Sequence, residues 1–147
     1  MRGYFGIGVE RISKAWNVGN LFRSAHAFGA SFVFTINAEY KRSVGIQSDT
    51  SDTLGQLPFY SFPKIDNLIL PENCSLIGIE FTENAIELPS FHHPNCATYV
   101  MGPERGSLSK DLSETLTILP FVSKILNIGS NSFFLVFIST PSLADSI

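Results

Sequence analysis

Three polar segments of the sequence hold the side chains best suited to chemistry. They are Asn17–Arg23, Gly102–Gly106 and Ile118–Asn127, and they place amide, guanidinium and carboxylate groups near glycines. Glycine lets the backbone come close to a ligand, and arginine supplies a permanent positive charge. Each segment follows or adjoins an apolar run, which is where ligand-binding groups gather in parallel α/β sheets. These segments are therefore the candidate binding and catalytic loops.

Each segment also has a purely structural interpretation. Asn17 is expected to cap the N-terminus of a helix, and Arg23 would then project from the polar face of that helix, where most arginines are solvated. Glu104 and Arg105 could form a surface turn with a weak ion pair. Asn127 could cap the last helix and have no other role. The order of the segments and their positions after strands favour a functional site.

Other catalytic and binding patterns are weak in this sequence. The Gly-Ile-Gly run that starts at Gly6 lacks the third glycine of a dinucleotide fingerprint, and there is no GKS or GKT phosphate loop. His92, His93 and Cys96 invite a metal interpretation, but Pro94 intervenes and no further ligand pair follows. We therefore expect an exposed loop there and no metal. The serines lack a nucleophile-elbow context, and no hydrolase triad is visible.

The elements that must position these segments alternate between strands and helices. Apolar residues at helical spacing after Asn17 predict a helix that ends at Gly29. A last helix is predicted over Asn127–Ile138, and a small element over Leu54–Phe62. A strand, a helix and a strand in succession imply parallel pairing, so the fold class is α/β. Apolar runs predict strands over Tyr4–Val9, Ser31–Ile36, Leu76–Phe81, Ala97–Met101 and Leu116–Leu119.

Composition places the chain among globular domains. It has 147 residues, 44% hydrophobic and 16% charged, which predicts one domain that folds without disulfides or a structural metal. Cys74 and Cys96 lack the spacing of a zinc or redox motif and are expected to be reduced thiols. No secretory signal is visible over Met1–Ala15, and the apolar run Phe133–Ile138 is too short to span a membrane. We therefore expect a cytoplasmic protein without a membrane segment.

Charge is distributed unevenly along the chain. The formal net charge is −3, which argues against binding nucleic acid through bulk charge alone. Residues 1–50 contain six basic and three acidic side chains, whereas residues 51–147 contain four basic and ten acidic ones. A polyanion is therefore expected to bind the first third of the chain, through Arg2, Arg11, Lys14, Lys41 and Arg42.

Taken together, the three segments resemble the signature motifs of the SpoU/TrmH family of RNA ribose 2′-O-methyltransferases, within the knotted SPOUT superfamily. The first motif is matched by Asn17, Gly19 and Arg23, the second by Gly102–Gly106 and the third by Ile118–Asn127. The resemblance implies a single domain over residues 1–147, with no accessory RNA-binding domain. It also implies a parallel sheet flanked by helices, with a deep trefoil knot near the C-terminus.

The same resemblance implies a cofactor, a partner and an RNA substrate. The cofactor would be S-adenosyl-L-methionine, and the protein would be a homodimer. The substrate would be tRNA in preference to rRNA. By position in the family motifs, the cofactor contacts would fall near Glu80, Gly102, Ile118 and Leu126.

The catalytic roles implied by the resemblance centre on Arg23, the group nearest the ribose hydroxyl. Asn17, Glu104 and Asn127 would organise this arginine and the loops. An arginine is a poor general base because its pKa exceeds about 12. We therefore expect Arg23 to hold the phosphate and stabilise the developing alkoxide, with proton removal assisted by the substrate phosphate.

Two departures from the family pattern keep other functions open. The third motif reads Lys124–Asn127 without the Ser-Leu-Asn of many members, and the tail Phe133–Ile147 is unlike the usual last helix, which supplies dimer contacts. The leading hypothesis is an enzyme that methylates a ribose 2′-hydroxyl. The second is a SPOUT-fold protein that binds RNA and cofactor with weakened catalysis. The third is a plain α/β interaction module without cofactor.

Overall fold

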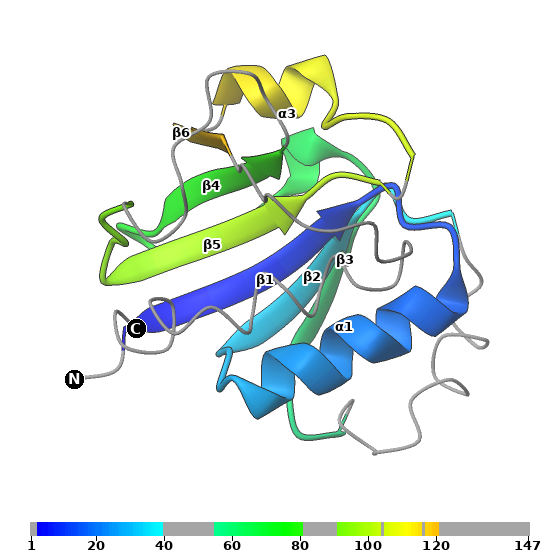
Figure 1. Cartoon of the computed structure of the whole chain (residues 1–147), viewed down its shortest axis with the longest axis horizontal. Coiled ribbons are helices and arrows are strands. Elements are labelled where there is room, and N and C mark those ends of the chain that lie inside the picture. Colours follow the sequence, from blue (N-terminus) through cyan, green and yellow to red (C-terminus); the bar gives the residue numbers. More distant parts are fainter. Residues whose placement is uncertain (1–2, 40–54, 81–90, 104, 116, 121–147) are drawn as a thin grey trace, which may run out of the picture.

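The computed structural model describes residues 3–39, 55–80, 91–103, 105–115 and 117–120, the last range by its backbone alone. Figure 1 shows the arrangement of the elements. The chain opens with a strand, a helix and a strand, as the sequence predicts. In chain order the elements are β1 (Tyr4–Glu10), α1 (Ala15–Ala27), β2 (Phe32–Ile36), β3 (Phe59–Phe62), the 3-10 helix η2 (Ile65–Asn67), β4 (Ser75–Glu80), β5 (Cys96–Met101), α3 (Lys110–Thr115) and β6 (Thr117–Pro120).

The strands form a parallel sheet in the order β3-β2-β1-β5-β4-β6. Because all neighbouring pairs are parallel, the carboxyl ends of the strands lie at one edge of the sheet (Figure 1). Met101 of β5 pairs with Val9 of β1 on one side and with Ile79 of β4 on the other. The register therefore aligns the ends of three adjacent strands.

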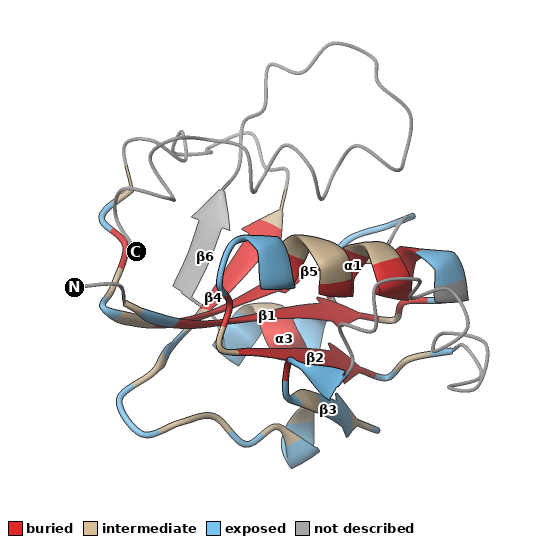
Figure 2. Cartoon of the chain, turned by 90° about the horizontal axis from the view of Figure 1, so that it is seen from below, coloured by how far each residue is buried: buried red, intermediate tan, exposed pale blue. Residues whose placement is uncertain are grey.

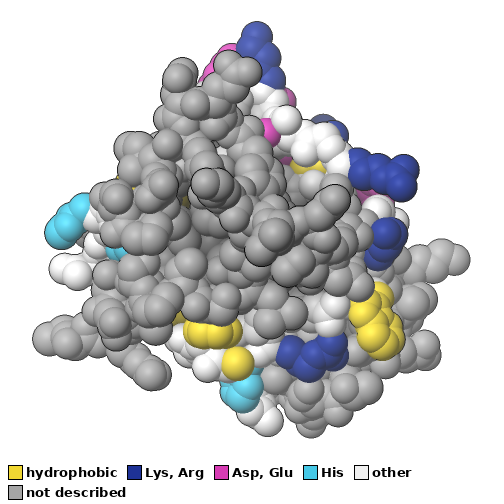
Figure 3. Space-filling view, in the orientation of Figure 1, with side chains coloured by type: hydrophobic (Ala, Val, Ile, Leu, Met, Phe, Trp, Pro, Cys, Tyr) yellow, Lys and Arg dark blue, Asp and Glu magenta, His cyan; other side chains and the backbone are white. Residues whose placement is uncertain are grey.

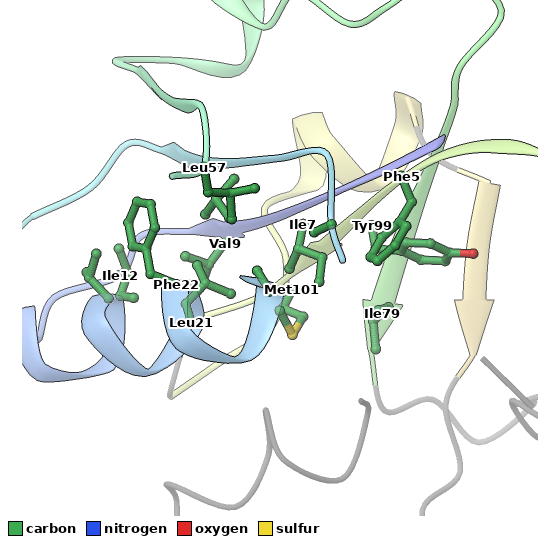
Figure 4. Close-up of a cluster of buried hydrophobic side chains, with 14 of the residues drawn as sticks. Phe5, Ile7, Val9, Ile12, Leu21, Phe22, Leu57, Ile79, Tyr99 and Met101 are labelled. Carbon is green, nitrogen blue, oxygen red and sulfur yellow. The ribbon is translucent and has the colours of Figure 1, made fainter. Parts of the chain in front are cut away.

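Helix α1 covers one face of this sheet. Its apolar side chains recur at helical spacing and are buried, and Leu21 and Phe22 point toward Val9 and Ile7 of β1 (Figure 4). The helix stops where Gly29 takes a positive φ of 75°, a conformation that glycine adopts without strain. The opposite face of α1 carries polar side chains that are only partly buried, including Arg23 of the first motif.

Helix α3 covers the other face of the sheet (Figure 2). Its Leu112 and the preceding Leu108 are buried in a second core with Phe32, Phe34 and Val100. The rings of Phe32 and Phe34 lie across β1, over two glycines of the strand, Gly6 and Gly8. A Cβ on either glycine would overlap the ring above it. These glycines therefore make room for aromatic packing.

Beyond those rings the second face has an open apolar cavity of about 360 Å³. Tyr4, Tyr60 and Ile69 border it and are exposed. Tyr4 is the first residue of β1, whereas the candidate motif loops follow the carboxyl ends of the strands. None of the residues that line the cavity belongs to the motif segments.

The sequence predicted the strands to within one residue at each end, except the small element over Leu54–Phe62, of which only Phe59–Phe62 is a strand. The expected N-cap was wrong. Helix α1 begins at Ala15, because the N–H of Asn17 already donates to the C=O of Lys14 (3.1 Å) and closes a first turn. The predicted helix over residues 127–138 and the implied knot lie outside the described residues.

Where the structure describes the chain, no helix is both long enough and apolar enough to cross a membrane.

We expect Gly8→Ala to destabilise the protein. The new methyl group must displace the ring of Phe34, which is fully buried, and overpacking of this kind costs about 1–3 kcal/mol. Urea unfolding of wild type and variant measures the change. In a Phe34→Leu background the same substitution should cost less, since the ring is gone. An equal cost in both backgrounds would show that the ring does not need the space.

Candidate functional site

The three predicted segments start from strand ends that share one edge of the sheet. The first lies on α1, directly after β1, the second follows β5, and the third begins within β6. Ile118 of β6 is the register partner of Gly78 in β4. Glu80, at the end of β4, accepts a hydrogen bond from the N–H of Leu108, and the nitrogen of Leu108 lies 3.3 Å from the position of a Cβ on Gly102. The fold therefore brings together Glu80, Gly102 and the backbone of Ile118, which are far apart in the sequence.

The first motif lies within helix α1. Asn17 is buried, with 4% of the residue exposed, and Gly19 is also buried. Arg23 is half-buried on the polar face, where its guanidinium donates a hydrogen bond to the side-chain oxygen of Asn20 one turn earlier. The predicted polar face of this helix is confirmed. Residues three apart on a helix lie next to each other on its surface, so Asn20 can hold the side chain of Arg23 in place.

The second motif loop turns back over the end of its own strand. A Cβ on Gly102 would lie 3.3 Å from the backbone nitrogen of Leu108 and 3.5 Å from the carbonyl carbon of Ser107. Contacts this close leave little room for a larger residue. Gly102 thus permits the loop to fold back, in addition to any approach to a ligand. Gly106, with a φ of 96°, allows the turn itself.

Two glutamates bind the returning part of this loop. The Leu108 N–H donates to Glu80 Oε1 (3.2 Å), and the Ser109 N–H donates to Glu10 Oε2 (2.8 Å). Glu10 is buried, with 5% of its side chain exposed. Glu80 was predicted from the family motifs to contact cofactor, and the structure places its carboxylate on the protein's own backbone.

Arg11 adds a third contact from the end of β1. Its Nη2 donates to the carbonyl oxygen of Ser107 (2.6 Å), and its Nε lies 4.0 Å from Glu10 Oε2. The residue has a φ of 52°, and its N–H donates to the carbonyl oxygen of Ile36 in β2 (2.8 Å). Arg11 was predicted to face RNA, whereas its guanidinium contacts its own loop.

Sequence reasoning missed Glu10 as a site residue. A signal was present, because β1 and β4 both end in glycine, a β-branched residue and glutamate, as Gly8–Glu10 and Gly78–Glu80. Three predicted site residues, Glu104, Leu126 and Asn127, lie outside the described residues. Their roles remain predictions.

The histidine segment differs from its prediction in one respect. His92 is exposed as expected, but His93 is buried, and its Nδ1 lies 2.6 Å from the hydroxyl of Tyr99. The expectation of an exposed loop was therefore wrong for His93, because an imidazole with a buried hydroxyl partner can be packed inside. In the described part of the chain, no three His, Cys, Asp or Glu residues are placed to hold a metal ion.

The two cysteines, Cys74 and Cys96, are free thiols near the amino ends of β4 and β5. Burial and a hydrogen bond with the Cys74 thiol raise the pKa of Cys96 to about 11. The Sγ of Cys74 lies 3.2 Å from the hydroxyl of Thr98. The Cys96 thiol is therefore neutral at ordinary pH and is a poor nucleophile.

Comparison with known proteins identifies the family. The sequence model of the SpoU rRNA Methylase family matches residues 5–128. No curated protein sequence matches the chain.

Solved structures share the fold at low sequence identity. The SpoU methyltransferase AviRb from Streptomyces viridochromogenes, in complex with the cofactor AdoMet, superposes with a TM-score of 0.76 at 16% identity, over 99% of this chain and 61% of that one. The AdoMet-bound rRNA methyltransferase from Sinorhizobium meliloti gives 0.75 at 14% identity, over 94% of this chain and 55% of that one.

A structure described as giving insight into 2-OH methylation of C/U34 on tRNA gives a TM-score of 0.78 at 13% identity, over 99% of this chain and 95% of that one. The chain thus spans little more than half of the Sinorhizobium protein and nearly all of the tRNA-related one. Since the family model matches most of its length, the chain belongs to the SpoU rRNA Methylase family.

Proposed function

We propose that this protein is an S-adenosylmethionine-dependent RNA methyltransferase that methylates a ribose 2′-hydroxyl. The observation that carries the proposal is the gathering of the three motif segments at one sheet edge, in a chain that the SpoU family model matches. We propose tRNA as the preferred substrate, with rRNA as the alternative. Support for tRNA comes from the near-complete overlap with the structure described for methylation of tRNA.

The cofactor would be S-adenosyl-L-methionine, which two of the similar structures contain. The residues at the sheet edge fit such a ligand, because Gly102 allows the loop to fold back and Arg105, Gly106 and Ser107 of that loop are exposed. Backbone groups of this loop and of Ile118 would hold the ligand, with Leu126 as a further predicted contact. When bound, the cofactor supplies an electrophilic methyl group.

Arg23 would act on the RNA through its charge. The hydrogen bond to Asn20 keeps the guanidinium on the polar face of α1, where it offers a positive charge and hydrogen-bond donors but no acceptor for a proton. The guanidinium would bind a substrate phosphate and stabilise negative charge on the attacking ribose oxygen. Asn17, Glu104 and Asn127 would organise the loops around it.

Assembly and the knot belong to this proposal as well. Family resemblance supports a homodimer and a trefoil knot formed by the C-terminal segment. A cytoplasmic location, expected from the sequence, is part of the proposal as well. The unusual tail is the reason to keep a second candidate, a SPOUT-fold protein with weakened catalysis that binds RNA and cofactor. Methyl transfer separates the two candidates, since only the enzyme turns over.

The RNA would bind the positive first third of the chain. Figure 3 shows Lys and Arg side chains at separate places around the border of the face that bears α1. Arg11 is bound to the protein's own loop. The other cations predicted to contact phosphate around the Arg23 segment are Arg2, Lys14, Lys41 and Arg42, and of these four the structure describes Lys14. In a homodimer, each of the two copies would contribute these positively charged residues to the RNA-binding surface.

We expect the wild type to transfer labelled methyl groups from S-adenosylmethionine to tRNA, with the label recovered as a 2′-O-methylated nucleoside. Arg23→Ala should fold and bind cofactor normally but lose about a hundred- to a thousandfold in turnover, as for other oxyanion contacts. Lys64→Ala, an exposed cation after β3, is the matched control. Near-normal turnover of Arg23→Ala would remove the assignment, and methylation of a base would contradict the 2′-hydroxyl target.

We also expect Lys41→Ala with Arg42→Ala to weaken RNA binding without changing cofactor affinity. Losing two phosphate contacts should flatten the slope of log affinity against log salt by roughly one to two units. Filter binding at several salt concentrations measures the slope, with Lys110→Ala on exposed α3 as the control. Equal slopes for wild type and double variant would place the RNA on another face.

A further inference from the structure

A row of three residues crosses the sheet where the second motif loop begins. Because Met101 pairs with Val9 and with Ile79, the next residues along each strand place Glu10 and Glu80 on either side of Gly102. Residues that are in register in parallel strands point to the same face. The row therefore consists of two carboxylates with a gap between them, since Gly102 has no side chain.

The returning backbone of the loop fills that gap. The nitrogen of Leu108 lies 3.3 Å from the position of a Cβ on Gly102. This N–H donates to Glu80, and the N–H of the next residue, Ser109, donates to Glu10. Two consecutive amides are thus bound by carboxylates from two different strands. A third hydrogen bond, from Arg11 to the carbonyl oxygen of Ser107, binds the residue just before these two amides.

These contacts fix the loop at its far end. The loop leaves β5 at Gly102, and its return is anchored at Ser107–Ser109, where Leu108 is also buried in the second core. Between the two ends, Arg105 and Gly106 are exposed. Anchoring both ends restricts the conformations that the exposed part can adopt, and a restricted loop binds a ligand at lower entropic cost.

Helix α3 does not by itself require this arrangement. Ser109 Oγ accepts the N–H of Leu112 (3.4 Å), so the helix already has a side-chain N-cap. Carboxylate acceptors are stronger than neutral ones, and a buried amide left without an acceptor is costly. The two glutamates therefore add rigidity to the loop beyond what capping of α3 supplies.

We propose that Glu10 and Glu80 are positioning residues that hold the loop after β5 in the shape that binds S-adenosylmethionine. The proposal rests on the proposed function and deepens it. In this proposal the side chain of Glu80 binds the N–H of Leu108. The backbone N–H and C=O of Glu80 would then be the groups that contact the cofactor. The proposal also brings Glu10, which no family motif named, into the site.

The proposal is tested by substitutions that change either the charge or the length of the glutamate side chains, but not both. Glu→Gln keeps an acceptor oxygen at the same distance, so Glu80→Gln and Glu10→Gln should bind cofactor within about threefold of wild type. Glu→Asp keeps the charge but shortens the side chain by one methylene. Glu80→Asp and Glu10→Asp should weaken cofactor binding by about ten- to a hundredfold, as expected for a lost hydrogen bond to a charged group.

Calorimetric titration with S-adenosylmethionine measures these affinities in the full chain. The matched control is Glu72→Asp, an exposed glutamate before β4. In methyl-transfer assays the Asp variants should raise the KM for cofactor more than they lower kcat, because the loop can still be closed by saturating ligand. Equal affinity of wild type and both Asp variants would overturn the proposal.

Trypsin cleavage after Arg105 gives a readout independent of cofactor and activity. This exposed arginine lies in the anchored loop, so loosening the loop should speed its cleavage about tenfold in the Asp variants and leave the Gln variants unchanged. A wild type that binds no S-adenosylmethionine would contradict the proposed function, and cleavage would still decide whether the glutamates hold the loop. Faster cleavage with unchanged cofactor affinity would overturn the positioning role while leaving the function intact.

Discussion

The parallel register of β1, β5 and β4 is the constraint on which the rest of the site depends. Met101 has a partner on both sides, so Gly102 stands between Glu10 and Glu80. A slip of one residue would turn these side chains to the opposite face of the sheet and separate the carboxylates from the amides that they bind. The register is secured by apolar side chains on both faces, which would become exposed if it shifted.

The two faces of the sheet carry different parts of the candidate site. Helix α1 packs on one face and presents Arg23, whereas α3 packs on the other and receives the loop after β5. Arg11 connects them, because it follows β1, precedes α1 and donates to Ser107 of the loop. The first and second motifs are thus joined by a direct hydrogen bond between the segments next to them.

Much of the fold could be predicted from the sequence, because short apolar runs and helical spacing are local signals. The strands and the polar face of α1 follow from such patterns. The start of α1 did not, because it is set by a backbone hydrogen bond from the N–H of Asn17 to the carbonyl of Lys14, which no side chain signals. The burial of His93 did not, because it depends on the hydroxyl of Tyr99 in β5. The motif pattern predicted Gly102 and Glu80 as site residues, and those roles stay predictions. The contribution of Glu10 needed the register, since its partner Ser109 is 99 residues away.

The most direct test of this account is amide hydrogen exchange at Leu108 and Ser109 in the free wild-type protein. If the glutamates hold the loop before any ligand binds, these two amides should exchange about as slowly as the amides of β5, while those of the exposed Arg105 and Gly106 exchange fast. Fast exchange at Leu108 and Ser109 in the free protein would contradict the account, because the loop would then be ordered by its ligand rather than by the sheet.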